Sequence, residues 1–526
     1  MMSINDIIVL LTLIIALIAI ISEKNRLHIV LKLNTTDYII FAAAFCLINY
    51  FVFYQSFEQR GIVIHWLYFD NFGFYEPRHY AYLITLASLG YLLYKIYSSF
   101  YAFSQIEKVD AFYRKQIENH EISFLLDLLE RYHKKDIIRL VSRSADQREG
   151  NALDYYLERY RKKPFRERAG DWLATRVRNL VLVSWYNRRD YAYNVLNFVI
   201  NSPGFIDQAA NLRPYFFSDI FAVFTRKKRQ AFPDDLINSF LTELLNQKNF
   251  WLKKELKESE NFDGGQPDSF HETNQILSSL IKNLSVADVN QVWQPFGTAA
   301  VTEIELERRK GKQSPLYFEY VSEAQLWEFK IQFTIRFLNT VITEAIAKQY
   351  TDSHFWLFYD NRIVTQITET WQAYPLEEEL LVHSISFRFV QNIYDDLLSW
   401  LHLANKKAHT GLYFDIISCI GNTLNVLMDS PVYPEKEKIE LVDRLLGVYC
   451  GLNENEQTDS LRTELETHLL KPSMLTREDS SYYKVFGNAW KKFDKIPHRS
   501  LKADADYFAR LKINVIVPLG LDPDEH

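Results

Sequence analysis

An arginine-rich band is the part of this sequence whose residue types and spacing point most directly to chemistry. Within residues 159–189, basic side chains alternate with aromatic rings that extend from Tyr155 to Tyr191. The basic residues are Arg159, Arg161, Lys162, Lys163, Arg166, Arg168, Arg176, Arg178, Arg188 and Arg189. Guanidinium groups bind phosphate oxygens in pairs and stack on flat rings, and proteins that bind single-stranded nucleic acid interleave such cations with aromatic rings. The band is therefore a candidate binding site for an oligonucleotide or nucleotide ligand.

The distribution of charge leaves two other interpretations of the band open. The whole chain has a net charge of −6, yet residues 151–230 hold 15 basic and 7 acidic residues, whereas residues 231–526 hold 30 and 44. A basic patch near a bilayer gains about 1 kcal/mol per residue from anionic lipid. The band can equally pair with the acidic C-terminal part, within one chain or between subunits. A phosphate-bearing ligand, a lipid surface and an acidic protein face are thus the three alternatives.

The motifs of common enzymes and metal sites are missing from the sequence. No G-x-S-x-G elbow or H-E-x-x-H pair occurs, and Gly264-Gly265 lacks the Lys-Ser/Thr pair of a phosphate-binding loop. Cys46, Cys419 and Cys450 are too few and too far apart for a disulfide framework or a structural zinc site. We therefore expect no enzyme activity, no metal and no cofactor.

Length and composition indicate a folded chain of several regions. At about 100–200 residues per domain, 526 residues allow two to four domains. Charged residues make up 24% of the chain and Gly and Pro together number 31, which excludes disordered and collagen-like classes. The sequence predicts a transmembrane region over residues 1–104, a basic helical region over 105–257 and an acidic helical region over 271–526.

Three apolar runs occupy the N-terminal region, over residues 4–21, 38–57 and 80–103. A helix needs roughly 20 apolar residues to cross a bilayer, and each run is close to that length. Tyr and Phe near the ends of the second and third runs are typical of interfacial anchors. The first run is too long for a secretory signal and has no basic residues before it. The runs therefore predict three transmembrane helices.

Basic residues in the short loops predict the orientation of these helices. Three basic residues lie within 23–37 and three within 108–115, whereas 58–79 holds two basic and three acidic residues. Because Lys and Arg are concentrated in cytoplasmic loops, the N-terminus is expected outside. The part of the chain that follows residue 104, called the body below, is then expected in the cytoplasm. This arrangement corresponds to a multi-pass protein of the inner (cytoplasmic) membrane.

Four polar residues fall on one face of the third expected membrane helix. They are Thr85, Ser88, Lys95 and Ser99. One interpretation is that they line a water-filled path between copies of the protein, with Lys95 as a charged ring. The other is that Lys95 extends to the cytoplasmic interface while the hydroxyls bond their own backbone. An anchor needs one helix and no polar face, so the first interpretation, a homo-oligomer with a central path, stays open beside the second.

From Gln105 onward, the sequence of the body predicts amphipathic helices. Leu376–Ala404 is typical, because it has a wide apolar stripe at helical period and three glutamates near its start. Lys512–Pro518 (KINVIVP) is the one segment that looks extended. No fixed repeat is visible, so a degenerate array of helical hairpins is the expected architecture of this all-α body.

This layout resembles the membrane effectors of bacterial antiphage defence systems, which also have membrane helices joined to a large helical body. The nearest resemblance is to the channel-type effector of the Hailong system. It implies that a membrane region is controlled by a helical domain that binds a single-stranded DNA oligomer, and that the inner membrane is depolarised after phage sensing. The resemblance covers the architecture and no diagnostic motif, so it assigns no individual residue.

Two functions from different classes remain. In the first, the protein is a ligand-controlled membrane effector, an oligomeric ion channel or membrane-depolarising protein gated by its body. In the second, it is a membrane-anchored scaffold or receptor that recruits cytoplasmic protein partners. Three membrane helices with polar groups in register exceed what tethering requires, so the sequence favours the effector.

Overall fold

A computed structural model describes residues 23–33, 35–64, 77–97, 103–135, 137, 195–225, 236–246, 251–260, 275–351, 356–407, 410–452, 458–470, 481–494 and 508–521. Within these ranges the regular structure is helical, and the extended backbone pairs only at an isolated bridge between Glu319 and Ser384. The expected all-α fold is confirmed for this part of the chain. The chain divides into two compact units, residues 1–212 and 213–526, which are described separately.

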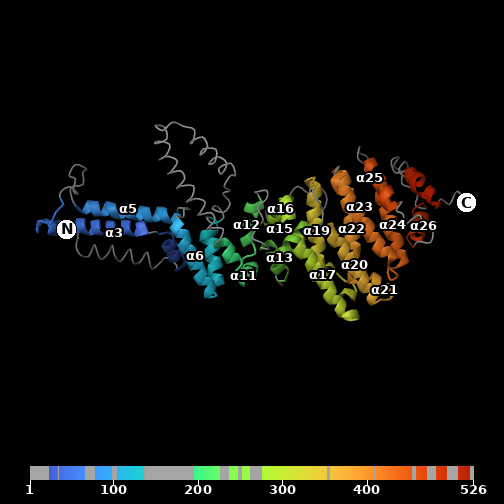
Figure 1. The fold of residues 1–526 in the computed structure, drawn as a ribbon, viewed down its shortest axis with the longest axis horizontal. Coiled ribbons are helices and arrows are strands. Elements are labelled where there is room, and N and C mark those ends of the chain that lie inside the picture. Colours follow the sequence, from blue (N-terminus) through green and yellow to red (C-terminus); the bar gives the residue numbers. More distant parts are fainter. Residues whose placement is uncertain are drawn as a thin grey trace, which may run out of the picture. The chain divides into compact units, whose positions relative to one another are not determined.

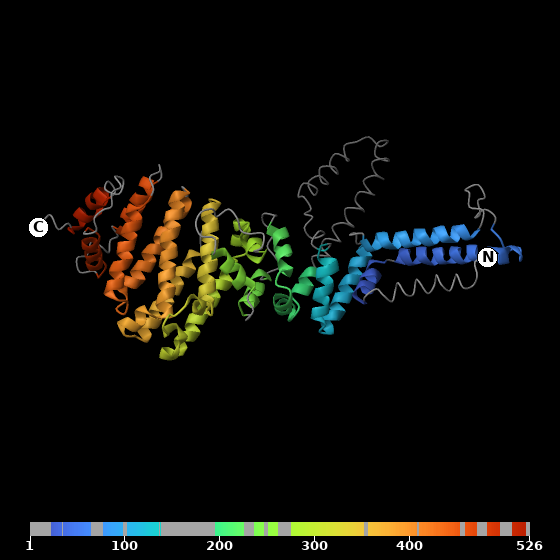
Figure 2. The ribbon, with the colours of Figure 1, turned by 180° about the vertical axis from the view of Figure 1, so that it is seen from behind.

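The N-terminal unit contains a hairpin of two long helices and a group of shorter amphipathic helices (Figure 1). The helices are α2 (Glu23–Lys32), α3 (Thr35–Val52), α4 (Tyr54–Glu58), α5 (Pro77–Tyr97), α6 (Phe103–Glu118), α7 (Ile122–Leu128), the π-helical turn η3 (Leu129–His133) and α11 (Phe205–Leu212). Helices α3 and α5 lie side by side along their length, as Figures 1 and 2 show from opposite sides. Helix α2 contacts both α5 and α6, and α7 contacts α6 and α11.

Aromatic packing fixes the end of the hairpin where α3 ends and α5 begins. Phe51, Tyr54 and Ala81 are buried there, and the rings of Phe51 and Tyr80 stack with their centroids 5.3 Å apart. Burial of such rings contributes a large share of apolar surface and restricts the approach of the two helices. The hairpin is thus closed at this end by apolar contacts, and its opposite end is closed by charge.

The membrane helices are only partly as expected. Helix α3, which overlaps the second apolar run, is the one described helix that is long and apolar enough to cross a membrane. The run over 4–21 lies outside the described residues. A third span over 80–103 is not shown, because α5 does not reach this hydropathy and residues 98–102 lie outside the described residues. Helix α5 covers Pro77–Tyr97, and its charged residues and tyrosines lower its hydropathy below that of a typical span.

The C-terminal unit packs its long helices against one another in sequence (Figures 1 and 2). The helices are α12 (Phe216–Thr225), α13 (Leu236–Asn246), α14 (Trp251–Glu260), α15 (Gln275–Ile281), α16 (Leu284–Val289), α17 (Gln294–Arg309), α18 (Glu323–Leu326), α19 (Lys330–Ala347), α20 (Leu357–Ala373), α21 (Glu378–Val382), α22 (Ile385–Lys406), α23 (Thr410–Asp429), α24 (Glu435–Cys450), α25 (Thr458–Leu465) and α26 (Ser481–Asp494). Helix α17 packs on α19 and α20, and α19 packs on α22. Helices α20 and α22 pack on α23, and α24 packs on α26. The shorter helices α12 and α14 both contact α15, and α13 contacts α17.

Two segments of this unit differ from the sequence expectation. The amphipathic run over 376–404 is interrupted, because α21 ends at Val382 and Ser384 begins α22 as its N-cap. The Ser384 hydroxyl accepts a hydrogen bond from the Phe387 N–H at 3.2 Å. The expectation of an extended segment over 512–518 is wrong. It forms the helical turns η7 (Lys512–Ile516) and η8 (Val517–Leu519).

Tertiary contacts explain the helical form of this C-terminal segment. Val515 and Ile516 are fully buried, although β-branched side chains favour strands when nothing else decides. Asn514 Nδ2 donates to Glu466 Oε2 at 3.2 Å, and the Tyr483 hydroxyl donates to the Leu519 carbonyl at 2.7 Å. Packing against the preceding helices therefore overrides the local preference.

Candidate functional site

An ion pair joins the two helices of the hairpin at the end where α3 begins and α5 ends. Lys95 Nζ lies 3.1 Å from Asp37 Oδ1, and the Tyr91 hydroxyl donates to the same oxygen at 2.6 Å. The side chain of Asp37 is 1% exposed and that of Lys95 is 22% exposed. Asp37 lies in the first turn of α3 and Lys95 in the last turn of α5, where the helix dipoles favour these charges. Each charge supplies the partner that the other needs once it leaves water.

Lys108 of α6 extends this cluster toward the helices that follow the hairpin. Its ammonium group donates to the Leu33 carbonyl at 3.0 Å and lies 6.0 Å from the centroid of the Tyr38 ring. Leu33 directly follows α2, and the carbonyls at a helix end have no partner within the helix. The residues Leu33, Asp37, Tyr38, Tyr91, Lys95 and Lys108 are called the junction cluster below. Through them, α6 contacts the corner between α2 and α3, and α3 contacts the end of α5.

The structure places the predicted pore-lining residues in different surroundings. The Thr85 hydroxyl donates to the Ala81 carbonyl at 2.8 Å, so it bonds its own helix, and Ser88 is half-buried. Lys95 belongs to the junction cluster, and Ser99 lies outside the described residues. A path lined by these residues between copies of the chain stays a prediction.

The structure does not describe the predicted ligand site, and it adds a residue, Asp37, that the sequence analysis did not single out. The whole arginine-rich band, residues 159–189, lies outside the described residues, so its ligand stays a prediction. Asp37 was not among the predicted site residues. Its signal in the sequence is a lone acidic residue in the first turn of an otherwise apolar helix, which calls for a basic partner elsewhere.

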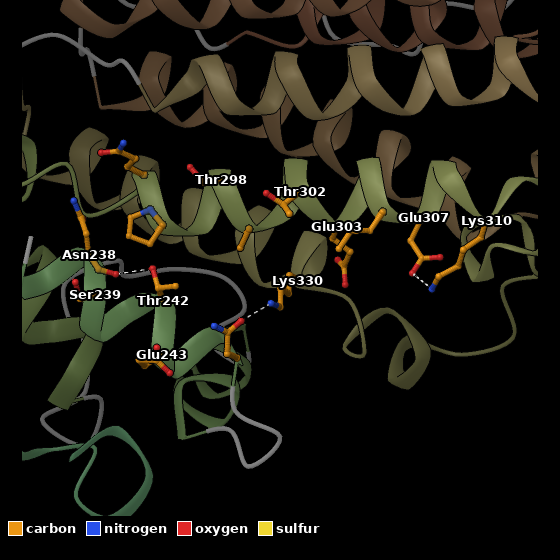
Figure 3. Close-up of a pocket in the computed structure, with 15 residues that line it drawn as sticks. Asn238, Ser239, Thr242, Glu243, Thr298, Thr302, Glu303, Glu307, Lys310 and Lys330 are labelled. Carbon is orange, nitrogen blue, oxygen red and sulfur yellow. Dashed lines mark hydrogen bonds and ion pairs between the residues drawn. The ribbon is translucent and has the colours of Figure 1, made fainter. Parts of the chain in front are cut away.

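A cleft of about 840 Å³ lies between α13 and α17 in the C-terminal unit (Figure 3). Its walls carry amides, hydroxyls and carboxylates, with a few apolar side chains between them. Helix α13 contributes Asn238, Ser239, Thr242, Glu243 and Asn246, α17 contributes Gln294, Thr298, Thr302, Glu303 and Glu307, and Lys310 and Lys330 add ammonium groups. None of these residues was singled out from the sequence, because only the packing of α13 on α17 brings them together.

Both ammonium groups of the cleft are engaged with acceptors on its walls (Figure 3). Lys310 Nζ lies 2.6 Å from Glu307 Oε1, and Lys330 Nζ donates to Asn246 Oδ1 at 2.7 Å. Glu243, by contrast, forms no hydrogen bond or ion pair with the described residues. The cleft therefore offers a negative charge that no described residue pairs with.

Glu303 has a structural task and an unusual acidity. Its Oε2 accepts a hydrogen bond from the Ile331 N–H at 3.0 Å in the first turn of α19, whose N-cap residue, Phe329, has no side-chain acceptor. Burial raises the pKa of Glu303 from 4.5 to about 7, and the opposing effects of the α19 N–H groups and of Lys330 are smaller. This carboxyl group therefore titrates close to neutral pH.

Comparison with protein-family models, curated proteins and solved structures finds no match to this chain. The function must therefore be inferred from the junction cluster, the cleft and the sequence.

Proposed function

We propose that the protein is a ligand-controlled membrane effector, in which the N-terminal regions of a homo-oligomer form an ion channel or another membrane-depolarising path. The single observation that carries the proposal is the ion pair of Asp37 and Lys95, buried between two helices whose outer surfaces are apolar. In this proposal the body controls whether the path conducts ions, and α6 transmits that control to the hairpin.

The outer surface of the hairpin supports its place in a bilayer. On α3, Ile39 and Phe45 are each 63% exposed, and on α5 Tyr82 and Tyr94 are 62% and 66% exposed. Apolar side chains of this size gathered on one element mark contact with lipid or protein, because water does not favour them. We infer that α3 and α5 both span the membrane as a hairpin and that the run over 4–21 supplies a third span.

The ion pair supports an effector more than an anchor. Ionisable residues within membrane helices are costly, and they mark ion pathways, relays or sensors in the proteins that retain them. A hairpin that served only to tether the body would be more stable with apolar residues at both positions. Lys108 of α6 contacts the corner where α3 begins, so a displacement of α6 would change the environment of the pair.

Location and ligand follow from the sequence. We place the N-terminus outside and the body in the cytoplasm, in a multi-pass protein of the inner membrane. The arginine-rich band is the proposed site for an oligonucleotide or nucleotide, and the architecture resembles the antiphage channel effectors described above. Affinity for single-stranded DNA should fall steeply as salt rises, because binding releases counterions. A variant with Arg166, Arg168, Arg176 and Arg178 replaced by glutamine should lose this binding, and full retention would contradict the assignment.

A membrane-anchored scaffold is the second candidate function. The serial packing of the long helices in the C-terminal unit supports it, because stacked helices present extended surfaces that bind proteins. In that case the hairpin would only tether the unit, and cytoplasmic protein partners would bind the array.

A membrane-potential assay in bacterial cells separates the two functions. Cells would express the wild type, Lys95→Met or the control Lys115→Met, which changes an exposed lysine of α6. The effector proposal expects the wild type or Lys95→Met to depolarise the membrane, the two to differ, and the control to match the wild type. If all three proteins reach the membrane and none changes the potential, the scaffold is the better account.

A further inference from the structure

We propose that the cleft between α13 and α17 binds an extended cationic amine, either a free polyamine or the basic side chains of a peptide strand. The inference concerns the C-terminal unit alone and does not depend on the proposed membrane function.

The first argument is the balance of charged donors and acceptors in the cleft. Lys310 donates to Glu307 at 2.6 Å and Lys330 donates to Asn246 at 2.7 Å, so both ammonium groups already have an acceptor. Glu243 on α13 has no such partner among the described residues, and Glu303 faces the cleft from α17 (Figure 3). A ligand that brings N–H donors and positive charge would pair with these carboxylate groups.

A second observation is an enclosed acceptor without a partner. Asn238 is half-buried, but its Oδ1 atom is fully buried and accepts no hydrogen bond in the described structure. Such an atom is rare in a folded protein and calls for a ligand or a water molecule as its donor. The Thr242 hydroxyl donates to the Asn238 backbone carbonyl at 2.7 Å, so its oxygen is also left as an acceptor for a ligand.

The shape and the lining favour this ligand class over others. The described residues that line the cleft include no arginine and no aromatic ring, the groups that bind phosphates in a bidentate manner and stack on bases or sugars. The lining residues follow one face of α17 from Gln294 to Lys310, a stretch of about 24 Å at helical rise. An elongated ligand with several amines therefore fits better than a compact one.

Proton release provides a signature of the ligand's charge. The carboxyl group of Glu303 has a pKa of about 7 in the free protein because of burial. A cation beside it favours the ionised form, so binding near neutral pH should release a proton from this group. A neutral ligand would leave its protonation unchanged.

The test is calorimetry on the full-length protein in a neutral detergent. One arm titrates spermidine, and the other titrates a peptide with the sequence of residues 159–168, which carries six basic residues. Glu243→Gln should weaken binding by about tenfold, as expected for one lost charge-assisted contact. Glu305→Gln is the control, because Glu305 is an exposed glutamate of α17, the other helix of the cleft, and does not line the cleft.

A pair of variants at the exposed Thr298 tests the electrostatic reasoning without disturbing the core. Thr298→Lys should weaken the binding of both probes, and Thr298→Glu should strengthen it.

Proton release, measured in buffers of different ionisation enthalpy, should disappear in Glu303→Gln, whose amide oxygen can still cap α19. Binding of spermidine alone would assign a free polyamine, and tighter binding of the peptide would assign a protein strand. Absence of binding by both probes, or equal affinity of the two Thr298 variants, would overturn the proposal.

Discussion

Removal of the Lys95 charge should open the hairpin at the end where α3 begins. In Lys95→Met the side chain of Asp37, which is 1% exposed, loses its contact with the Lys95 ammonium group but keeps the hydrogen bond from Tyr91 at 2.6 Å. Loss of one member of a buried ion pair costs about 3–5 kcal/mol. Because Lys95 is 22% exposed and Tyr91 still donates to Asp37, we expect the lower end, about 3 kcal/mol. This change corresponds to roughly a hundredfold increase in the population of the open state.

Hydrogen exchange in lipid nanodiscs measures this opening locally. The amides of the first turns of α3 and the last turns of α5 should exchange about a hundredfold faster in Lys95→Met, because exchange follows the local opening free energy. The double variant Asp37→Asn/Lys95→Met removes both charges and should return to within about tenfold of the wild type. Lys115→Met should exchange like the wild type. Unchanged exchange in Lys95→Met, or a double variant as fast as the single one, would refute the reasoning.

Three further predictions concern the C-terminal unit and can be checked by denaturant unfolding. Because burial raises the pKa of Glu303 from 4.5 to about 7, the folded state binds this proton more tightly than the unfolded state. Stability should therefore decrease as pH rises from 4.5 to about 7, by up to about 3 kcal/mol, and Glu303→Gln should remove this dependence. Ser384→Ala should cost about 1 kcal/mol, because α22 loses its N-cap acceptor. Gly297→Ala should destabilise by about 1–3 kcal/mol, since its Cβ would overlap the Tyr359 ring, whereas Gly447→Ala, with open space around it, should not.

Local patterns predicted the helices well where no distant contact intervened. The apolar run at 38–57 became α3, and the amphipathic pattern after residue 376 became α21 and α22. The interruption at Ser384 was not predicted, because a serine inside an amphipathic run reads equally well as a solvent-facing residue or as a cap. The segment at 512–518 was predicted as extended from its β-branched residues. The burial of Val515 and Ile516 against the preceding helices decided otherwise.

The candidate sites depend on contacts that the sequence does not encode locally. Lys95 was identified as a charged residue in an apolar helix, but its partner Asp37 is 58 positions away, and only the packing of α3 on α5 joins them. The cleft likewise consists of ordinary polar residues on α13 and α17 that form a site only when the two helices pack together. Sequence patterning therefore indicated which element carries a charge, and the fold determined what that charge contacts.

Ion flux into lipid vesicles that contain the purified full-length protein tests the central claim most directly. Flux would be measured for the wild type and Lys95→Met, each with and without short single-stranded DNA. The account predicts that the DNA changes the flux through the wild type and that Lys95→Met differs from the wild type in the same vesicles. Correctly inserted protein that conducts no ions in any of these conditions would contradict it.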